Sequence, residues 1–177
     1  MITLEIHKNS ITALHTDAVV NAANKELHSG SGVCGAIFAC AGSEALAAEC
    51  AKFGGCSTGS AVITSACGMP NAKYIIHAVG PRYYGGLHGE QFLLGSCYKK
   101  ALELARDSGC RSVAFPLISA GIFGYPEREA WIVALHTCLD FIDANPDTDM
   151  AIVFVRQHRD QVDLGKQILS EVLAARS

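Results

Sequence analysis

Two glycine loops contain the residues that are best suited to ligand binding or catalysis. The first runs from Asn21 to Gly42 (NAANKELHSGSGVCGAIFACAG). It leaves the apolar run 18–20, tightens at three glycines and passes into an Ala-rich helical pattern. A strand, a glycine loop and a helix start in this order form an anion site. Glycine lets the backbone approach a ligand, and the first N–H groups of a helix have no partner. We expect this loop to hold a diphosphate, with Asn24 at its reactive end.

A second loop of the same kind follows later in the chain. The segment Ser119–Gly124 (SAGIFG) also runs from the end of an apolar strand to the start of a helix. Two such loops can grip a diphosphate from both sides with backbone N–H groups and hydroxyls, and this mode needs no lysine. The alternative is that both are ordinary strand-to-helix turns, in which glycine serves only the backbone geometry.

The first loop also contains GSGVCG at Gly30–Gly35, a literal match to the GxGxxG pattern of dinucleotide-binding folds. Such folds place the pattern directly after the strand, with an acidic residue about 20 positions further on at the end of a second strand. Here the eight residues 22–29 intervene, and the later region reads as helix followed by Gly54-Gly55. A nicotinamide or flavin site of this type is therefore disfavoured.

Composition favours an α/β fold. The chain has 177 residues, of which 50% are hydrophobic and 7% aromatic, so a core of Val, Ile, Leu and Ala fits buried parallel strands in one domain. The net charge of −3 gives no sign of binding to nucleic acid or to a membrane surface, although a local basic patch is compatible with it. No apolar run reaches the ~18 residues of a membrane span, and the start MITLEIHKNS does not resemble a signal peptide.

Eight cysteines are scattered through apolar segments, and none forms a CxxC pair. This pattern indicates buried thiols in a reducing compartment rather than disulfides. A zinc site would need clustered Cys and His residues, and the sequence has no such cluster. We therefore expect a cytoplasmic protein that uses no metal and no other cofactor.

Strand-like and helix-like segments alternate along the chain. The strand-like segments are 2–6, 18–21, 61–65, 74–79, 112–118 and 150–155, with Pro116 at the end of its strand or in a distortion. The helix-like segments are 34–53, broken at Gly42 with Ser43 as a second N-cap, then 90–108, 126–144 opened by Pro126, and 160–175. The alternation predicts a three-layer α/β/α sandwich over residues 1–177. Its sheet is expected to be mixed and largely parallel, with ligands at the carboxyl ends of the strands.

Five segments together resemble the macrodomain family. They occur in the family's order and cover nearly the whole chain: AVVNAAN (18–24), GVCGAIF (32–38), CSTGSAVIT (56–64), IIHAVGP (75–81) and PLISAGIFGYP (116–126). The chain is most similar to the branch of ADP-ribosyl hydrolases and O-acetyl-ADP-ribose deacetylases found in bacteria, mitochondria and some RNA viruses. The resemblance implies ADP-ribose in a cleft at the strand ends, with no metal or redox cofactor.

The resemblance also implies a role for individual residues. Asn24 would bind the distal ribose and help to place the attacked carbon or the water, which suits an amide because it offers a donor and an acceptor. Ile11 would meet the adenine with its N–H group, and Arg156 would lay its guanidinium plane over the base. Two phosphate loops would be formed by Gly32, Val33 and Cys34 and by Ser119, Ala120, Gly121, Ile122 and Phe123, with Phe123 also against the distal ribose.

Three positions depart from the family pattern. Members commonly have Asp where Ser10 stands, to accept from the adenine amino group, and Ser10 is uncharged and shorter. Hydrolases of this branch commonly have Asp where Cys34 stands, as a candidate for activating water. Viral members with the same GVC sequence nonetheless resemble hydrolases, which suggests that the substrate's own phosphate and Asn24 orient the water. The usual Ala-Ile-His is here Ala-Ile-Phe at residues 36–38.

Other reactive residues have plainer interpretations. Cys34, at a helix start, is a possible nucleophile, but no histidine partner is evident for it. His77 lies mid-strand in an apolar run and fits a structural role. The segment Arg82–Tyr84 either covers the cleft or forms a solvated loop.

Four functions are compatible with these residues. The leading hypothesis is hydrolysis of the ester at the distal ribose of ADP-ribose, in mono-ADP-ribosylated proteins or in O-acetyl-ADP-ribose. The alternative that Cys34 motivates is a non-catalytic reader of ADP-ribose. An ADP-ribose 1″-phosphate phosphatase is a further variant. Binding of RNA or other nucleotides has little support from the pI of about 6.1.

Overall fold

The computed structural model describes residues 1–177 as six strands and five helices. The strands are β1 (Ile2–Lys8), β2 (Ala18–Ala22), β3 (Ala61–Ser65), β4 (Tyr74–Ala78), β5 (Ser112–Phe115) and β6 (Met150–Arg156). The helices are α1 (Gly32–Ala41), α2 (Ser43–Ala51), α3 (Glu90–Asp107), α4 (Glu127–Ala144) and α5 (Arg159–Arg176). The predicted alternation of strands and helices is confirmed.

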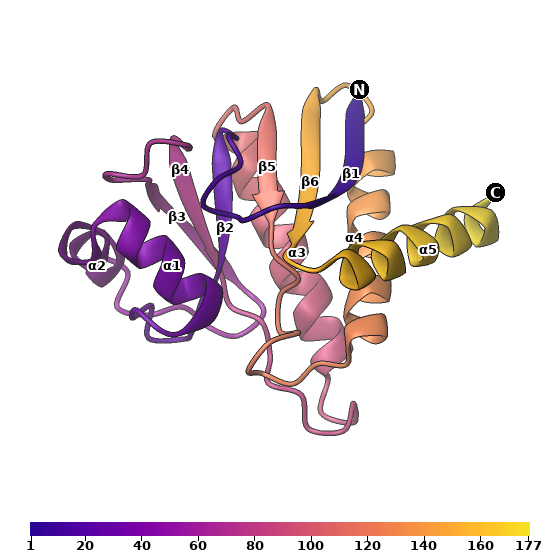
Figure 1. Ribbon diagram of the computed structural model, residues 1–177, viewed down its shortest axis with the longest axis horizontal. Helices are drawn as coiled ribbons and strands as arrows, with labels where there is room; N and C mark the ends of the chain where they lie inside the picture. Colours follow the sequence, from indigo (N-terminus) through magenta and orange to yellow (C-terminus); the bar gives the residue numbers. More distant parts are fainter.

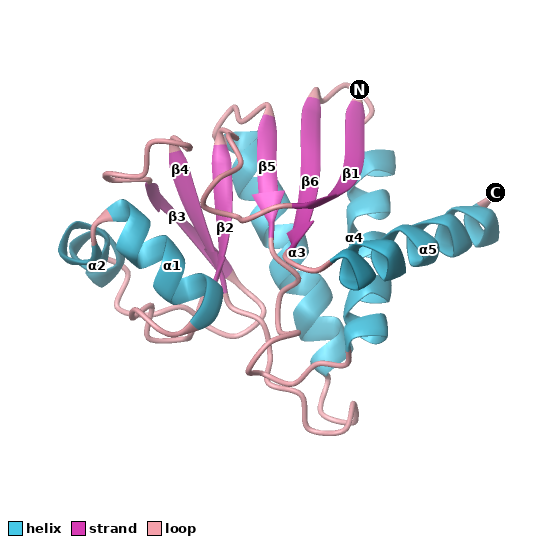
Figure 2. Cartoon of the chain, viewed as in Figure 1, coloured by secondary structure: helices cyan, strands magenta, loops and turns pink.

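The strands form one mixed sheet in the order β1-β6-β5-β2-β4-β3 (Figures 1 and 2). All neighbours are parallel except the edge strand β3, which runs antiparallel to β4. Helices α1 and α2 lie on one side of the sheet, and α3 and α4 lie on the other (Figure 1). This is the predicted three-layer sandwich, and the carboxyl ends of its five parallel strands meet at one edge.

The central strands are buried on both faces, which explains their apolar runs. In β2, Ala18 and Val20 belong to the larger core with α3, α4 and α5, whereas Val19 belongs to the smaller core with α1 and α2. In β4, Ile76 and Ile75 divide between the two cores in the same way. Because side chains alternate between the faces of a sheet, such strands are apolar along most of their length, and their buried polar residues, Asn21 and His77, are hydrogen-bonded to each other.

The chain leaves the sheet at Pro116, so β5 ends at Phe115 and the predicted extension to residue 118 is wrong. Proline has no N–H group to give to a strand neighbour. The buried hydroxyl of Tyr98 on α3 takes over that role. It donates to the Pro116 carbonyl at 3.5 Å and accepts from the Ile118 N–H group at 2.9 Å. The second glycine loop therefore starts from a fixed point.

Several helix boundaries also differ from prediction. The first helical segment begins at Gly32, and it is divided as expected at Gly42, whose φ of 94° is a left-handed conformation that favours glycine. Gly42 itself is the N-cap of α2, and the predicted cap Ser43 is the first helical residue. Pro126 likewise stands at the N-cap, and α4 begins at Glu127.

All eight cysteines are free thiols; five are buried and Cys67 alone is exposed. No three His, Cys, Asp or Glu side chains converge where they could hold a metal ion. No single helix is long and apolar enough to cross a membrane. Only α1 and α2 taken together reach that length and apolarity, and they are bent by 104° at their junction.

Candidate functional site

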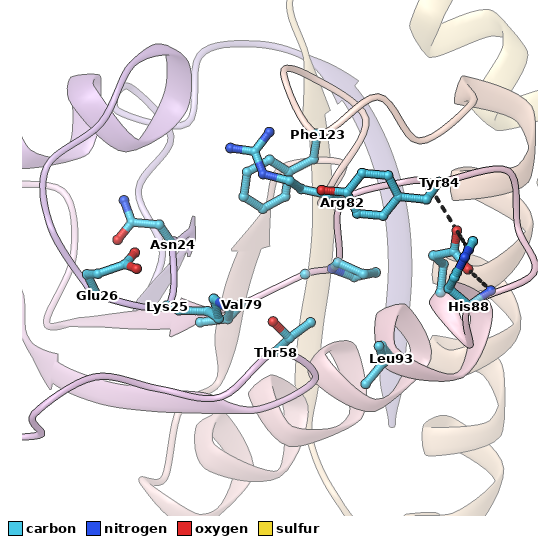
Figure 3. Close-up of a pocket in the computed structure, with 13 residues that line it drawn as sticks. Asn24, Lys25, Glu26, Thr58, Val79, Arg82, Tyr84, His88, Leu93 and Phe123 are labelled. Carbon is cyan, nitrogen blue, oxygen red and sulfur yellow. Dashed lines mark hydrogen bonds and ion pairs between the residues drawn. The ribbon is translucent and has the colours of Figure 1, made fainter.

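Two adjoining cavities open at the edge of the sheet where the parallel strands end. The first, called the glycine-loop cavity, has a volume of about 170 Å³ and is lined by both glycine loops. The second, called the Asn24 cavity, has a volume of about 530 Å³ and includes Asn24 and Arg82 in its walls (Figure 3). Gly80 and Phe123 line both cavities, which together form one extended cleft.

The structure brings most of the predicted ligand residues to this cleft. Those that line the glycine-loop cavity are Gly32, Val33, Cys34, Ser119, Gly121, Ile122, Phe123 and Arg156. Asn24 lines the Asn24 cavity. Ser10, Ile11 and Ala120 line neither, and Ala120 packs against the larger core instead.

Helix α1 begins with its first N–H groups at the glycine-loop cavity. Ser31, which precedes the helix, makes no side-chain capping bond, so the N–H groups of the first turn have no acceptor from a cap. The loop before the helix is tight, because a Cβ atom at Gly35 would lie 2.5 Å from the Gly30 carbonyl oxygen. The positive end of the helix dipole therefore faces the cavity, as an anion site requires.

The second glycine loop presents a buried hydroxyl without a partner. Ser119 has a φ of 68°, in the left-handed region that residues other than glycine rarely adopt. Its side chain is buried, and its Oγ atom makes no hydrogen bond within the protein. Backbone strain and an unpaired buried hydroxyl both raise the free energy of a fold and are concentrated at functional sites. A ligand oxygen in the glycine-loop cavity would satisfy this hydroxyl.

The side-chain amide of Asn24 is held by the backbone of His28. Asn24 Nδ2 donates to the His28 carbonyl and Asn24 Oδ1 accepts from the His28 N–H group, both at 2.9 Å. The amide lies beside the first glycine loop, since a Cβ atom at Gly30 would stand 3.7 Å from Asn24 Nδ2. One Nδ2 hydrogen and one Oδ1 lone pair remain for a ribose hydroxyl or a water molecule.

The Cys34 thiol is a buried structural group. Its Sγ atom accepts from Asn21 Nδ2 at 3.7 Å and donates to the His28 carbonyl at 3.5 Å. Burial raises the pKa of Cys34, and the hydrogen bonds to its sulfur only partly offset that rise. Because the thiol stays protonated near neutral pH, it is poorly suited to act as a nucleophile or as a base.

His77 belongs to a buried polar network behind the first glycine loop. Its Nδ1 atom lies 3.1 Å from Asn21 Nδ2 and its Nε2 atom 3.1 Å from Thr64 Oγ1. Asn21 Nδ2 can only donate, so Nδ1 accepts and Nε2 carries the proton that it donates to Thr64. Burial lowers the pKa of His77 to about 4, so the ring is neutral at physiological pH. This environment agrees with a structural histidine.

Arg156 stands at the end of β6 with its guanidinium fixed in a plane. Its Nη2 and Nε atoms donate to the two carboxylate oxygens of Glu127, the first residue of α4, at 2.5 and 3.2 Å. Glu127 Oε2 also accepts from Trp131 Nε1 at 3.2 Å. The bidentate ion pair uses the edge of the planar guanidinium and fixes its orientation, so its faces stay available for stacking on a ring.

The segment that contains Ser10 and Ile11 lies beside the same strand end. The Asn9 N–H group donates to the Arg156 carbonyl at 3.1 Å. The Ile11 N–H group has no acceptor within the protein, which leaves it free for the predicted contact with adenine. The Ser10 hydroxyl lies 3.0 Å from the Thr12 hydroxyl.

The role of Arg82 in the Asn24 cavity could not be predicted from the sequence. The Arg82 guanidinium carbon lies 4.5 Å from the centre of the Phe123 ring, within the range of a cation–π contact. The Tyr83 N–H group donates to the Phe123 carbonyl at 2.9 Å and ties the two loops together. Of the two interpretations of this segment, Arg82 and Tyr84 cover the cleft, although Tyr84 is also largely exposed.

Glu90 was also missed as a site residue. It is buried, and its carboxylate accepts from the backbone N–H groups of Tyr84, Gly86 and His88 at 2.8, 3.0 and 2.6 Å. Burial alone would raise the pKa of Glu90, but these hydrogen bonds lower it to about 2. The available signal was an acidic residue at a helix start directly after a glycine-rich loop.

Comparison with known proteins extends these observations. A family model of the Macro domain matches residues 20–134. An uncharacterised protein of Fusobacterium nucleatum is 52% identical over 139 residues, which cover 78% of each chain. The human ADP-ribose glycohydrolase MACROD2 is 43% identical over 152 residues, which cover 85% of this chain and 35% of that protein.

Solved structures agree with the sequence comparison. An Oceanobacillus iheyensis macrodomain with ADP has a TM-score of 0.86 and 34% identity, and the match covers 96% of this chain and 91% of that one. A Trypanosoma brucei macrodomain in complex with ADP-ribose has a TM-score of 0.84 and 34% identity, over 94% of this chain and 68% of that one. The family match includes more than half of the chain, and the chain therefore belongs to the macro domain family, as its motifs predicted.

Proposed function

We propose that this chain binds ADP-ribose along the extended cleft and hydrolyses an ester at the distal ribose. The observation that carries the proposal is the position of Asn24, whose amide is fixed by His28 where the first glycine loop meets the Asn24 cavity. The Trypanosoma brucei macrodomain in complex with ADP-ribose supports the ligand. The similarity to an ADP-ribose glycohydrolase supports the hydrolysis.

The ligand would run from the end of β6 to the Asn24 cavity. Adenine would lie between the Arg156 guanidinium and the free Ile11 N–H group. The diphosphate would lie in the glycine-loop cavity, between the first turn of α1 and the Ser119 hydroxyl. The distal ribose would pass Phe123 to reach Asn24. The Ile11 N–H group and the Ser119 hydroxyl have no competing partner within the protein, so binding breaks no bond at either.

Two substrate classes fit this arrangement: mono-ADP-ribosylated acidic side chains and O-acetyl-ADP-ribose, since both carry an acyl ester on the ribose. Hydrolysis adds one water molecule, breaks one ester C–O bond and releases a carboxylate, a ribose hydroxyl and one proton. The buried thiol of Cys34 cannot take that proton, because burial raises its pKa and the thiol is already protonated near neutral pH. In the proposed mechanism Asn24 orients the water, and the diphosphate of the substrate accepts the proton before solvent does.

The decisive experiment compares the wild type with Asn24→Ala on a Glu-linked ADP-ribosylated peptide and on O-acetyl-ADP-ribose. We expect the wild type to release product, and Asn24→Ala to lower kcat/KM by about 100-fold. The affinity for free ADP-ribose, measured by calorimetry, should change by less than about tenfold. A wild type that binds ADP-ribose and releases nothing from either substrate would refute the hydrolase.

A non-catalytic reader of ADP-ribose is the second candidate. The observation that favours it is the protonated thiol of Cys34 at the position where hydrolases of the resembled branch commonly have Asp. Cys34→Asp discriminates the two functions. If the protein is a reader, the wild type is inactive, and activity arises, if at all, only in Cys34→Asp. If it is a hydrolase that uses the substrate's phosphate, the wild type is already active.

A further inference from the structure

The Asn24 cavity contains two cations that have no ion-pair partner. Lys25 and Arg82 line it, and neither takes part in any of the protein's ion pairs. Glu90 lines the same cavity, but its carboxylate is 2% exposed and is occupied by three backbone N–H groups. Glu26 is the only other carboxylate in the lining. The accessible charge of the cavity is therefore two cations against one carboxylate.

Arg82 is exposed, and its one recorded side-chain contact orients it within this cavity. One face of its guanidinium covers the Phe123 ring at 4.5 Å, and the following residue, Tyr83, is bonded to the Phe123 carbonyl. The ring occupies a face of the guanidinium and leaves the N–H groups at its edge available for an anion. In Figure 3 the guanidinium extends over Phe123 on the side that faces Asn24.

We propose that Arg82, assisted by Lys25, forms a carboxylate subsite that binds the acyl group on the distal ribose and the carboxylate that leaves. This inference rests on the proposed hydrolysis and identifies what holds its leaving group. The acyl group of the ester is uncharged, and negative charge grows on its oxygens as the C–O bond breaks. A positively charged guanidinium beside those oxygens therefore stabilises the transition state more than the substrate. Lys25 adds a second positive charge to the same cavity.

Binding of acetate tests the subsite without any turnover. The protein is saturated with ADP-ribose, so that the glycine-loop cavity is occupied, and is titrated by NMR with acetate and with the uncharged analogue acetamide. We expect the wild type to prefer acetate by at least about tenfold, which corresponds to one charge-assisted hydrogen bond. Arg82→Ala should abolish the preference and Arg82→Lys should restore part of it.

Two further variants sharpen the titration. Glu26→Gln removes the opposing carboxylate and should tighten acetate binding, which is the opposite direction to Arg82→Ala. Lys166→Ala removes an exposed cation on α5 and should leave acetate binding unchanged. Acetate affinity that is equal in the wild type and Arg82→Ala overturns the proposal. So does a lower affinity of Arg82→Ala for ADP-ribose itself, because Arg82 would then hold a phosphate.

Turnover gives a separate test. With a Glu-linked substrate, Arg82→Ala should lower kcat/KM by about 10- to 100-fold while the Kd for ADP-ribose stays within about twofold. Unchanged turnover in Arg82→Ala overturns the subsite. If the wild type shows no hydrolysis at all, the proposed function fails, and the acetate titration still decides whether the carboxylate subsite exists.

Discussion

Gly80 and Ser119 touch where the two cavities of the cleft meet: a Cβ atom on Gly80 would lie 2.3 Å from the Ser119 hydroxyl oxygen. The same atom would lie 2.5 Å from Ile118 Cγ2. Gly80→Ala must therefore shift the side chains of Ser119 and Ile118 at the start of the second glycine loop. We expect ADP-ribose affinity to fall by at least about tenfold in calorimetry. Gly95→Ala on α3, whose Cβ atom would meet nothing closer than 3.4 Å, is the matched control and should bind normally.

Removal of the unpaired hydroxyl of Ser119 should lower the affinity for ADP-ribose without lowering the stability of the fold. Ser119→Ala keeps the Cβ atom and the left-handed backbone, and removes only a buried oxygen that has no partner. The free energy of unfolding should stay the same or increase, while the affinity for ADP-ribose should fall by about 1 kcal/mol. Urea unfolding and calorimetry measure the two quantities. A marked loss of stability without ligand would show that the hydroxyl already has a partner in the protein.

The buried His77 should make the free energy of unfolding decrease in acid. Burial lowers its pKa from 6.5 to about 4, so between these pH values the unfolded chain binds a proton that the folded chain does not. Stability is therefore complete above about pH 6.5 and declines as the pH falls toward 4, by roughly 2 kcal/mol between about pH 7 and about pH 5. Urea unfolding at the two pH values should show this decline. His77→Gln should flatten it, and an equally steep decline in that variant would locate the titrating group elsewhere.

Glu90 should control the order of the loop 84–89. Glu90→Ala leaves the N–H groups of Tyr84, Gly86 and His88 without their acceptor, and exchange of these amide protons with deuterium should become at least about tenfold faster. Glu90→Gln keeps one acceptor oxygen and should give an intermediate rate. Amide protons in β6 serve as the internal control, since Glu90 does not bond there. Equal exchange in all three proteins would mean that the carboxylate does not order the loop.

The packing of α4 on α5 requires a glycine. A Cβ atom at Gly165 would lie 2.6 Å from the indole ring of the buried Trp131. Gly165→Ala should therefore destabilise the protein by about 1–3 kcal/mol in thermal or urea unfolding, although alanine favours a helix. Gly95→Ala has room for its methyl group and should be neutral or stabilising by up to about 1 kcal/mol. Similar effects of both substitutions would show that helix propensity, and not the Trp131 contact, decides the outcome.

The sequence predicted the architecture because local patterns determine it. Apolar runs that are buried on both faces, as in β2 and β4, distinguish parallel central strands from helices. Boundaries were harder to predict. Ser43 has a high preference for an N-cap, but the left-handed Gly42 takes that position. The end of β5 depends on the hydroxyl of Tyr98, which comes from α3, a different element of the chain that packs against the sheet.

In the candidate site too, local features could be predicted from the sequence, whereas contacts between distant segments could not. Glycine loops can be predicted, since their chemistry lies in the backbone and their spacing is local. The Arg82–Phe123 contact joins two loops that are far apart in sequence, and only the fold shows that they meet. Glu90 had a local signal, an acidic first turn, but its partners are backbone groups that no residue type reveals.

The anchor at Glu90 has a consequence for how the cleft can diversify. Its hydrogen bonds come only from main-chain N–H groups, so the path of the loop does not depend on the side chain of Tyr84. It depends on the side chain of His88 only through the contact of 3.9 Å between His88 Nδ1 and Glu90 Oε2. Both side chains line the Asn24 cavity. Substitutions at these two positions can therefore alter the chemical preference of the cavity while the main-chain hydrogen bonds to Glu90 are kept. The two positions are natural starting points for engineering new selectivity.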